Sequence, residues 1–378
     1  MDNTYVPIGH NFKTLYGTKH REKGIPFLCP TIDDLTGGMH PGTLSVLAGG
    51  PGSMKTTTSI NIAYNAVKEG KNVCILTLEE TPYFLYCKLM SRVSVDIGIS
   101  LPVQEVVQNK LSYTDKQKLL DEVHPYFENM KGTIYFVGEE DFSLISKNSI
   151  SKKLEEINNL LIERSKKYGD EGHGIDLLII DHIQMLKYSN VLQKDEYRLL
   201  NEYVDYFRSQ AISFLDTKKP IAVLLLSQTT REGYNYAKKN DGMYMMQHIA
   251  ESSELDRAAT YIVSIYTDAE TQLSKQIKYY TVKLRNAPML MNSVNVFADG
   301  KYYQVGEIIP KSEVPDYGIS DIESVDLNIN NNTNSNQLTE SVLQEFGLLE
   351  GALSWQKMKM KKRHFWIEHY LVRLQKKK

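Results

Sequence analysis

The chain has 378 residues, of which 42% are hydrophobic and 24% are charged, so it can hold one large core or two domains of ordinary globular composition. A formal net charge of −2 excludes a basic field over the whole surface, and any contact with nucleic acid must therefore be made by a local patch. The most apolar runs, Ile175–Ile180 and Ile221–Leu226, have the length of strands, and the N-terminus lacks the apolar core of a signal peptide, so we expect no membrane span and no leader. The cysteines, Cys29, Cys74 and Cys87, form no C-x-x-C pair, which argues against a disulfide scaffold or a zinc site and favours a reducing, cytoplasmic compartment.

Residues 1–23 are polar and weakly patterned, and we expect an N-terminal arm there. From residue 24 to about residue 310, apolar runs of strand length alternate with segments of helical spacing. The predicted strands are Leu44–Ala48, Val73–Leu78, Thr133–Val137, Asp176–Ile180, Ala222–Ser227, Tyr261–Tyr266, Lys278–Leu284 and Ser293–Phe297. The predicted helices are Ser59–Glu69, Tyr83–Val93, Ser151–Lys167 and Glu196–Leu215. This alternation predicts an α/β domain whose mostly parallel sheet is flanked by helices on both faces, with the last two strands added as an antiparallel hairpin.

The composition changes after residue 310. Residues 311–337 become rich in Asn, Ser and Asp and offer little to bury, so we expect a flexible linker. Residues 338–378 have two helical patterns, Leu338–Phe346 and Trp355–Leu374, and the second is strongly basic and carries apolar side chains. Three roles are open for this tail: docking a partner protein, contacting DNA, or forming a solvated helix of little consequence.

The most informative motif is a Gly-rich turn between the first predicted strand and the first predicted helix. Glycines let backbone N–H groups turn inward around an anion, and the helix N-terminus adds its positive end. Lys55 would reach the β- and γ-phosphates of a nucleotide, and the Thr56 hydroxyl would hold Mg²⁺. The predicted nucleotide-binding residues are Gly49, Gly50, Pro51, Gly52, Ser53, Met54, Lys55, Thr56 and Thr57.

This phosphate loop departs from the usual pattern G-x-x-x-x-G-K-[ST], because Met54 stands at the position of the last glycine. Either the methionine side chain crowds the loop, or Gly50 and Gly52 provide the tight turn instead. The simplest alternative is a Gly/Pro-rich turn with a surface lysine.

Polar side chains end three further predicted strands, where α/β proteins bind ligands. Asp181 follows four apolar residues and would hold Mg²⁺ through water. Glu79 and Glu80 compete as the carboxylate that polarises the attacking water. Gln228 would contact the γ-phosphate and report its hydrolysis. Each has an ordinary alternative. Asp181 could simply end a buried strand, Glu79 and Glu80 could belong to a solvated acidic loop, and Gln228 could be a polar cap at a strand end.

Lys283 and Arg285 are two residues apart on a predicted strand and therefore share one face. Two cations at a hairpin tip suit an arginine finger that completes the site of a neighbouring subunit. Edge strands also carry such cations simply to prevent aggregation.

Taken together, these features resemble the ATPase domain of DnaB-type replicative helicases, which have a RecA-like fold. The resemblance covers about residues 24–308 and rests on several local matches in chain order. They are the phosphate loop, the opening segment from Gly24-Ile25-Pro26 to Pro41-Gly42, Leu78-Glu79, the segment from Ile180-Asp181-His182 to Leu186, Leu226-Ser227-Gln228, Glu251-Ser252 with Asp256, and Lys283-Leu284-Arg285-Asn286-Ala287-Pro288.

The resemblance implies a role for each matched residue. It selects Glu79 over Glu80 as the catalytic carboxylate, assigns Asp181 to Mg²⁺ and Gln228 to γ-phosphate sensing, and makes Arg285, with Lys283 beside it, the finger. We expect no counterpart of the family's helical N-terminal domain, because only about 23 residues precede the ATPase segment. Ring closure would therefore depend on the short arm, the ATPase interfaces or a partner, a layout that suits a phage or mobile-element helicase.

In a RecA-like ring, the loops after the Asp181 and Gln228 strands face the central channel. Here these are Lys187–Asp195 and Thr229–His248, and cations interleaved with tyrosines in such loops suit single-stranded DNA. A mobile polar loop with chance lysines is the alternative. The predicted DNA-binding residues are Lys187, Lys194, Arg231, Lys238 and Lys239, with Tyr234, Tyr236 and Tyr244 between them.

These expectations combine into an ATP- and Mg²⁺-dependent helicase that forms a homo-hexamer and moves on single-stranded DNA, 5′→3′ if it follows the family. Primase, a loader or a polymerase would be partners of the tail. A RecA- or RadA-like recombination ATPase and a degenerate scaffold or loader subunit remain alternatives, and Met54 motivates the second of these.

Overall fold

A computed structural model describes residues 23–167, 172–188, 196–217, 219–249 and 252–306, and all structural statements refer to these ranges. The predicted arm, apart from residue 23, and the predicted linker and basic tail lie outside the described residues. None of the described helices combines the length and the hydropathy that crossing a bilayer requires.

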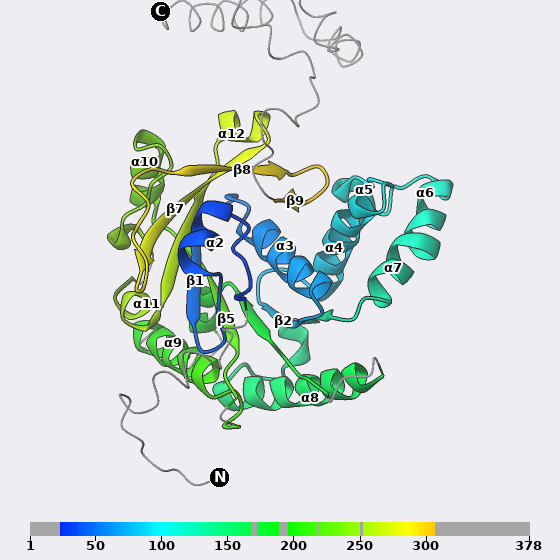
Figure 1. The fold of residues 1–378 in the computed structure, drawn as a ribbon, viewed down its shortest axis with the longest axis horizontal. Helices are drawn as coiled ribbons and strands as arrows, with labels where there is room; N and C mark the ends of the chain where they lie inside the picture. The colour runs from blue at the N-terminus through cyan, green and yellow to red at the C-terminus, as the bar shows by residue number, and fades with distance from the viewer. Residues whose placement is uncertain (1–22, 168–171, 189–195, 218, 250–251, 307–378) are drawn as a thin grey trace, which may run out of the picture. The chain divides into compact units, whose positions relative to one another are not determined.

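The centre of the fold is a nine-stranded sheet of order β3-β2-β4-β5-β1-β6-β7-β8-β9 (Figure 1). The first six strands in this order are parallel, and the last three are joined to them in antiparallel fashion. The strands are β1 (Leu44–Gly49), β2 (Asn72–Thr77), β3 (Thr133–Val137), β4 (Leu177–Asp181), β5 (Ala222–Gln228), β6 (Tyr261–Tyr266), β7 (Gln276–Leu284), β8 (Val294–Asp299) and β9 (Gln304–Val305). The predicted mostly parallel sheet with an antiparallel C-terminal addition is therefore confirmed, and the short strand β9 extends it.

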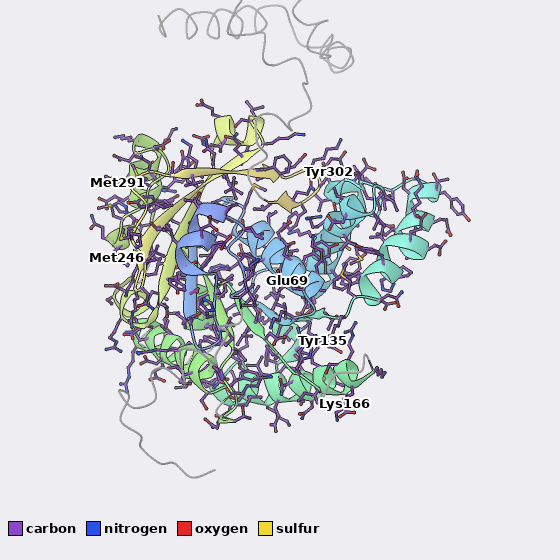
Figure 2. All side chains as sticks on the ribbon, viewed as in Figure 1. Glu69, Tyr135, Lys166, Met246, Met291 and Tyr302 are labelled. Carbon is purple, nitrogen blue, oxygen red and sulfur yellow. The ribbon has the colours of Figure 1, made fainter. Side chains whose placement is uncertain are left out.

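Two apolar clusters lie on the two faces of this sheet. One face of the central strands packs with α3 and α4, and the alternate residues of the same strands pack with α8 and α9. Figure 2 shows side chains filling the space between the sheet and these layers, with Glu69 just beyond the end of α3. Because β1, β4 and most of β5 are buried on both faces, they read as continuous apolar runs in the sequence.

The helices range from one turn to 20 residues in length. They are α2 (Pro30–Thr36), α3 (Lys55–Lys68), α4 (Pro82–Asp96), α5 (Val103–Val107), α6 (Tyr113–Lys118), α7 (His124–Glu128), α8 (Lys147–Lys166), α9 (Glu196–Ile212), α10 (Arg231–Lys239), α11 (Ser252–Ala258) and α12 (Ala269–Leu273). The four predicted helices correspond to α3, α4, α8 and α9, with ends that differ by a few residues. The short helices were not predicted, because one or two turns have too few residues to reveal a period.

The prediction of a channel loop over Thr229–His248 was wrong in one respect, because most of its first half is the helix α10. Thr230 caps this helix by accepting a hydrogen bond from the Gly233 N–H at 3.1 Å. Gly233 packs so closely against His248 that a Cβ atom there would lie 2.5 Å from the histidine Cβ. A glycine required by packing inside the helix hid the helical pattern in the sequence.

Candidate nucleotide site

The predicted phosphate loop connects the end of β1 to the first residue of α3. Gly52 has φ 72° and Met54 has φ 67°, so both adopt the left-handed conformation that favours glycine. A Cβ atom on Gly49 would lie 2.4 Å from the Ser53 Oγ and 2.7 Å from the Ile265 carbonyl oxygen, which explains a glycine there. The turn is thus shared by Gly52 and Met54, and the Met54 side chain packs against the apolar cluster that includes α3.

Helix α3 begins without a side-chain cap, since Met54 at its N-cap position provides none. The N–H groups of its first turn are therefore available to an anion, and the helix dipole adds positive potential at the same point. Lys55 is buried beside them, and its Nζ donates to the carbonyl oxygens of Gly49 at 3.0 Å and Gly50 at 2.9 Å. Burial lowers the pKa of Lys55, while the Asp181 and Glu79 carboxylates oppose this effect.

The Thr56 hydroxyl donates to Asp181 Oδ2 at 2.7 Å, so the start of α3 and the end of β4, which are far apart in the sequence, meet at this point. Asp181 is only 3% exposed, and burial raises the pKa of its carboxyl to about 6. A hydroxyl beside a poorly solvated carboxylate is a donor set that Mg²⁺ prefers, and a cation would relieve the cost of burying this charge. The residues present therefore fit the magnesium role that was predicted for Thr56 and Asp181.

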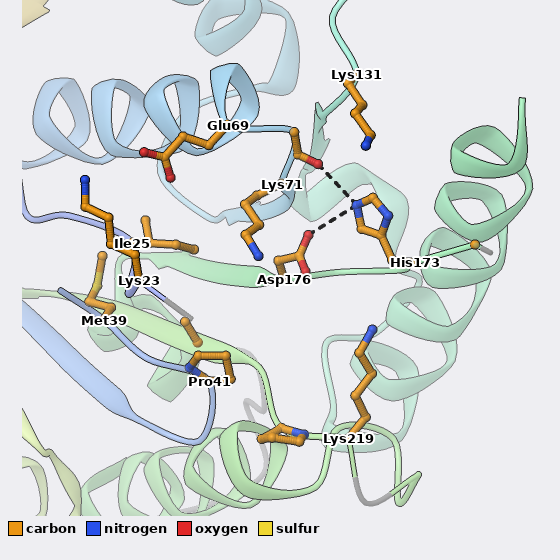
Figure 3. A pocket seen from close by; sticks show the side chains of 14 residues that line it. Lys23, Ile25, Met39, Pro41, Glu69, Lys71, Lys131, His173, Asp176 and Lys219 are labelled. Atoms are coloured by element: carbon orange, nitrogen blue, oxygen red, sulfur yellow. Dashed lines mark hydrogen bonds and ion pairs between the residues drawn. The ribbon is translucent and has the colours of Figure 1, made fainter. Parts of the chain in front are cut away.

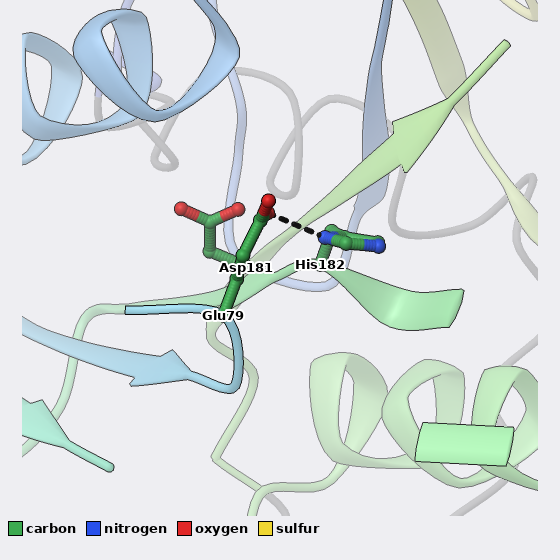
Figure 4. Close-up of side chains that lie close together, drawn as sticks. All are labelled: Glu79, Asp181 and His182. Atoms are coloured by element: carbon green, nitrogen blue, oxygen red, sulfur yellow. Dashed lines mark hydrogen bonds and ion pairs between the residues drawn. The ribbon is translucent and has the colours of Figure 1, made fainter. Parts of the chain in front are cut away.

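Glu79 and Glu80 follow β2 and differ in their surroundings. Glu79 lies at the edge of the site, where its Oε2 is 2.9 Å from Nδ1 of the buried His182. One oxygen or nitrogen from each of Glu79, Asp181 and His182 lies within 4.8 Å of the others (Figure 4). The Glu80 carboxylate instead pairs with Lys88 on α4. Of the two glutamates, Glu79 therefore has its carboxylate beside Asp181.

Gln228 is the last residue of β5, and the parallel register pairs it with Gly49. Its N–H donates to Gln184 Oε1 at 3.3 Å, and Gln184 Nε2 in turn donates to Ser227 Oγ at 2.8 Å. The buried Gln184 side chain thus holds the end of β5 against the segment after β4, and the pairing with β1 places the same end beside the phosphate loop. Sequence reasoning gave no role to Gln184 or His182, although both lie in the segment that carried the resemblance.

Lys283 and Arg285 do not lie with the other predicted site residues at the carboxyl ends of the parallel strands. Because β7 runs antiparallel to β6, Leu284 pairs with Tyr261 at the start of β6, and Tyr261 is level with Ser45 at the start of β1. The phosphate loop begins four residues farther along β1, which corresponds to about 13 Å of strand. Arg285 is exposed, and its Nη2 donates to the backbone carbonyl of residue 257 at 2.5 Å. These two cations are therefore at the opposite edge of the sheet from the phosphate loop of the same chain.

The predicted DNA-binding cations are only partly described. Arg231, Lys238 and Lys239 are exposed on α10, whereas Lys194 and the side chain of Lys187 lie outside the described residues. Tyr236 is partly exposed beside these cations, but Tyr244 is fully buried, so the prediction that it faces DNA was wrong. Its ring packs with Tyr266 at a centroid distance of 6.4 Å, next to the phosphate loop.

A pocket of about 640 Å³ lies at the amino ends of the parallel strands (Figure 3). His173 and Asp176 meet there at 3.5 Å, and lysines from several elements surround them. None of the predicted site residues lines this pocket. This pocket therefore lies at the opposite end of the strands from the predicted site. The motif residues converge at the carboxyl ends of the strands, where α/β proteins of this type bind ligands. The lysines of the pocket are Lys23, Lys71, Lys131 and Lys219.

Comparisons with known proteins agree with this geometry. The family model of the DnaB-like helicase C terminal domain matches residues 24–305. The chain is 23% identical to the probable replicative DNA helicase of Trieres chinensis over 288 residues, which are 74% of this chain and 56% of that protein. It is 25% identical to the replicative DNA helicase DnaB of Buchnera aphidicola over 287 residues, or 74% and 55% of the two chains. The chain thus spans about half the length of the curated relatives it matches.

Solved structures show the same fold. One solved ATPase domain superposes with a TM-score of 0.60 at 18% identity, covering 82% of this chain and all of that one. A DnaB-like replicative helicase solved in a study of its interactions with primase gives a TM-score of 0.61 at 17% identity, covering 81% and 69%. The predicted RecA-like fold and the predicted resemblance are confirmed, and the chain belongs to the family of DnaB-like helicase C-terminal domains.

Proposed function

We propose that the protein is an ATP-hydrolysing DNA helicase that assembles as a hexamer and moves along single-stranded DNA during replication. The observation that carries this proposal is the convergence of four strand ends at one edge of the sheet. These ends bring a phosphate loop, a buried aspartate, a glutamate and a glutamine together in a member of a replicative-helicase family. Family membership favours 5′→3′ movement and a cytoplasmic site of action in a bacterial or phage-infected cell.

The residues of this edge suit the steps of ATP hydrolysis. The N–H groups at the start of α3 and the Lys55 ammonium bind the phosphates, so Lys55 exchanges its loop carbonyls for phosphate oxygens. Mg²⁺, held by Thr56 and supported by Asp181, would neutralise phosphate charge. Glu79 accepts a proton from the attacking water, and Gln228 contacts the γ-phosphate at the end of the strand that leads into α10.

Arg285 would act on the site of a neighbouring subunit. Within one chain it is at the far edge of the sheet from the phosphate loop, so it serves catalysis only if another copy presents its own loop to it. An arginine that completes a neighbouring site makes hydrolysis depend on assembly. This placement favours a ring of like subunits, with Lys283 supporting the same face.

DNA would contact α10, where three exposed cations and Tyr236 follow directly after Gln228. Because Gln228 lies just before α10, loss of its contact with the γ-phosphate would change the position of α10 and so its contact with DNA. We assign residues 24–310 to the motor, 311–337 to a linker and 338–378 to a tail that contacts primase, a loader or a polymerase.

The first experiment is ATP hydrolysis with and without single-stranded DNA, with Lys55→Ala as the control. Strong stimulation by DNA that is lost in the control supports a DNA-coupled motor, and negative-stain images then separate closed rings from the open helices of a recombination ATPase. Absence of hydrolysis in both conditions overturns the motor and favours a scaffold or loader subunit. In that case Met54→Gly, which restores the usual glycine, tests whether the loop is the cause.

A further inference from the structure

The last residue of β4 and the segment that follows it contact three other parts of the site. Asp181 accepts from Thr56 on α3, and His182 pairs with Glu79 after β2. Gln184 contacts the end of β5 through both polar atoms of its side chain, Oε1 and Nε2. Three residues within a stretch of four thus tie the phosphate loop, the candidate catalytic carboxylate and the candidate sensor strand to one another. Among these ties, the one made by His182 acts directly on the carboxylate assigned to water activation.

Glu79 and His182 differ sharply in their exposure. The Glu79 side chain is 54% exposed, whereas the His182 side chain is 6% exposed at the end of a buried strand. The backbone brings the two together, because the Leu78 N–H donates to the Asp181 carbonyl oxygen at 2.8 Å and so continues the pairing of β2 with β4. A rigid, buried donor therefore holds one oxygen of a side chain that is otherwise free to sample many rotamers in water.

The surrounding charges do not hold the Glu79 carboxylate in one place by themselves. Ligand atoms of Glu79, Asp181 and His182 all lie within 4.8 Å of one another, so the Asp181 carboxylate repels that of Glu79. The Lys55 ammonium attracts both carboxylates, and it makes hydrogen bonds to the loop carbonyls rather than to Glu79. A carboxylate can only accept hydrogen bonds, so the Nδ1 atom of His182 must be the donor, which leaves the other Glu79 oxygen to accept a proton from water.

We propose that His182 is a positioning residue for ATP hydrolysis, which holds the Glu79 carboxylate beside Asp181 through the hydrogen bond from its Nδ1 atom. This inference rests on the proposed function and deepens it. In this assignment, His182 aligns the general base Glu79, next to the aspartate that supports magnesium, Asp181.

The test uses the full chain with five single changes and one double change. The single changes are His182→Ala, His182→Asn, His182→Gln, Lys88→Ala and Glu79→Gln, and the double change combines His182→Ala with Glu79→Gln. The asparagine places an N–H donor near the position of Nδ1, whereas the glutamine places it near Nε2. Lys88→Ala is the matched control, because it removes the charged partner of the neighbouring Glu80 instead. Turnover with saturating single-stranded DNA and Mg²⁺, affinity for a fluorescent ATP analogue, and melting temperature are measured for each.

We expect His182→Ala to lower kcat by about 10- to 100-fold, because misplacing a general base by an ångström has an effect of this size. The dissociation constant for the analogue should stay within about 3-fold, since the phosphates are bound elsewhere. His182→Asn should recover most of the lost turnover and His182→Gln should not, whereas Lys88→Ala should stay within about 3-fold of the wild type. In a Glu79→Gln background, His182→Ala should cause no further loss, since the two residues then act as one unit.

Wild-type kcat in His182→Ala, equal turnover in the asparagine and glutamine variants, or additive losses with Glu79→Gln would each overturn the assignment. If His182→Ala does not fold, the comparison of asparagine with glutamine still decides. Absence of turnover in the wild type would refute the proposed function rather than the positioning. Crystal structures with a non-hydrolysable ATP analogue then show whether Glu79 keeps its place in His182→Asn and leaves it in His182→Gln.

Discussion

Replacing Asp181 by asparagine should stabilise the folded protein while it removes ATP hydrolysis. Burial raises the pKa of this carboxyl from its ordinary value of 3.8 to about 6, so the folded state disfavours the ionised form. For such an acid, stability is highest below the unfolded pKa and is lost as the pH rises through the folded pKa. At about 1.4 kcal/mol per pKa unit, the ionised Asp181 lowers the free energy of unfolding by about 3 kcal/mol at pH 8 and by about half of that at pH 5.

Asparagine keeps the acceptor for the Thr56 hydroxyl and has no charge to bury. Urea denaturation in EDTA and without nucleotide should therefore show Asp181→Asn to be more stable than the wild type by about 3 kcal/mol at pH 8, with a melting temperature raised by roughly 6 °C. The gain should shrink as the pH falls toward 4. Glu79→Gln is the control, because its exposed carboxylate should contribute within about 0.5 kcal/mol at either pH. A destabilised Asp181→Asn protein, or a gain that does not change with pH, would refute this reasoning.

Three further outcomes are expected. Met54→Gly should remove about 1 kcal/mol of left-handed backbone strain from the folded state, but the glycine also stabilises the unfolded chain by a similar amount through its conformational entropy. The free energy of unfolding measured in urea should therefore change little, and ATP turnover should be kept or raised. Turnover that appears only in the variant would mean that the native chain is a scaffold. Mixing Arg285→Ala with Lys55→Ala protein should restore part of the ATPase activity that each variant lacks alone. The Arg285→Ala copy supplies an intact phosphate loop, and the Lys55→Ala copy supplies an intact arginine finger. No recovery in rings shown to be mixed would exclude action between subunits. Replacing the three exposed cations of α10 by alanine should lower the slope of log affinity against log salt for single-stranded DNA by about 2, measured by fluorescence anisotropy, and an unchanged slope would place the DNA elsewhere.

Local sequence determined the parts of the site that depend only on position along a strand. A buried parallel strand needs a continuous apolar run, and its carboxyl end is marked by the polar side chains that follow. This is why the sequence alone could place Asp181 and Gln228 at one edge of the sheet. The phosphate loop could be recognised for a similar reason, since a strand, a Gly-rich turn, a lysine and a helix are all local features.

The tertiary structure decided what the polar groups contact. Nothing along the chain indicates that His182 lies 2.9 Å from Glu79, because the two meet only through the pairing of β2 with β4. The position of Arg285 likewise follows from the antiparallel direction of β7, which carries it away from its own phosphate loop. Hydrogen-bond partners distant in sequence are set by strand order and register, and these depend on how all the apolar surfaces pack together rather than on any one segment.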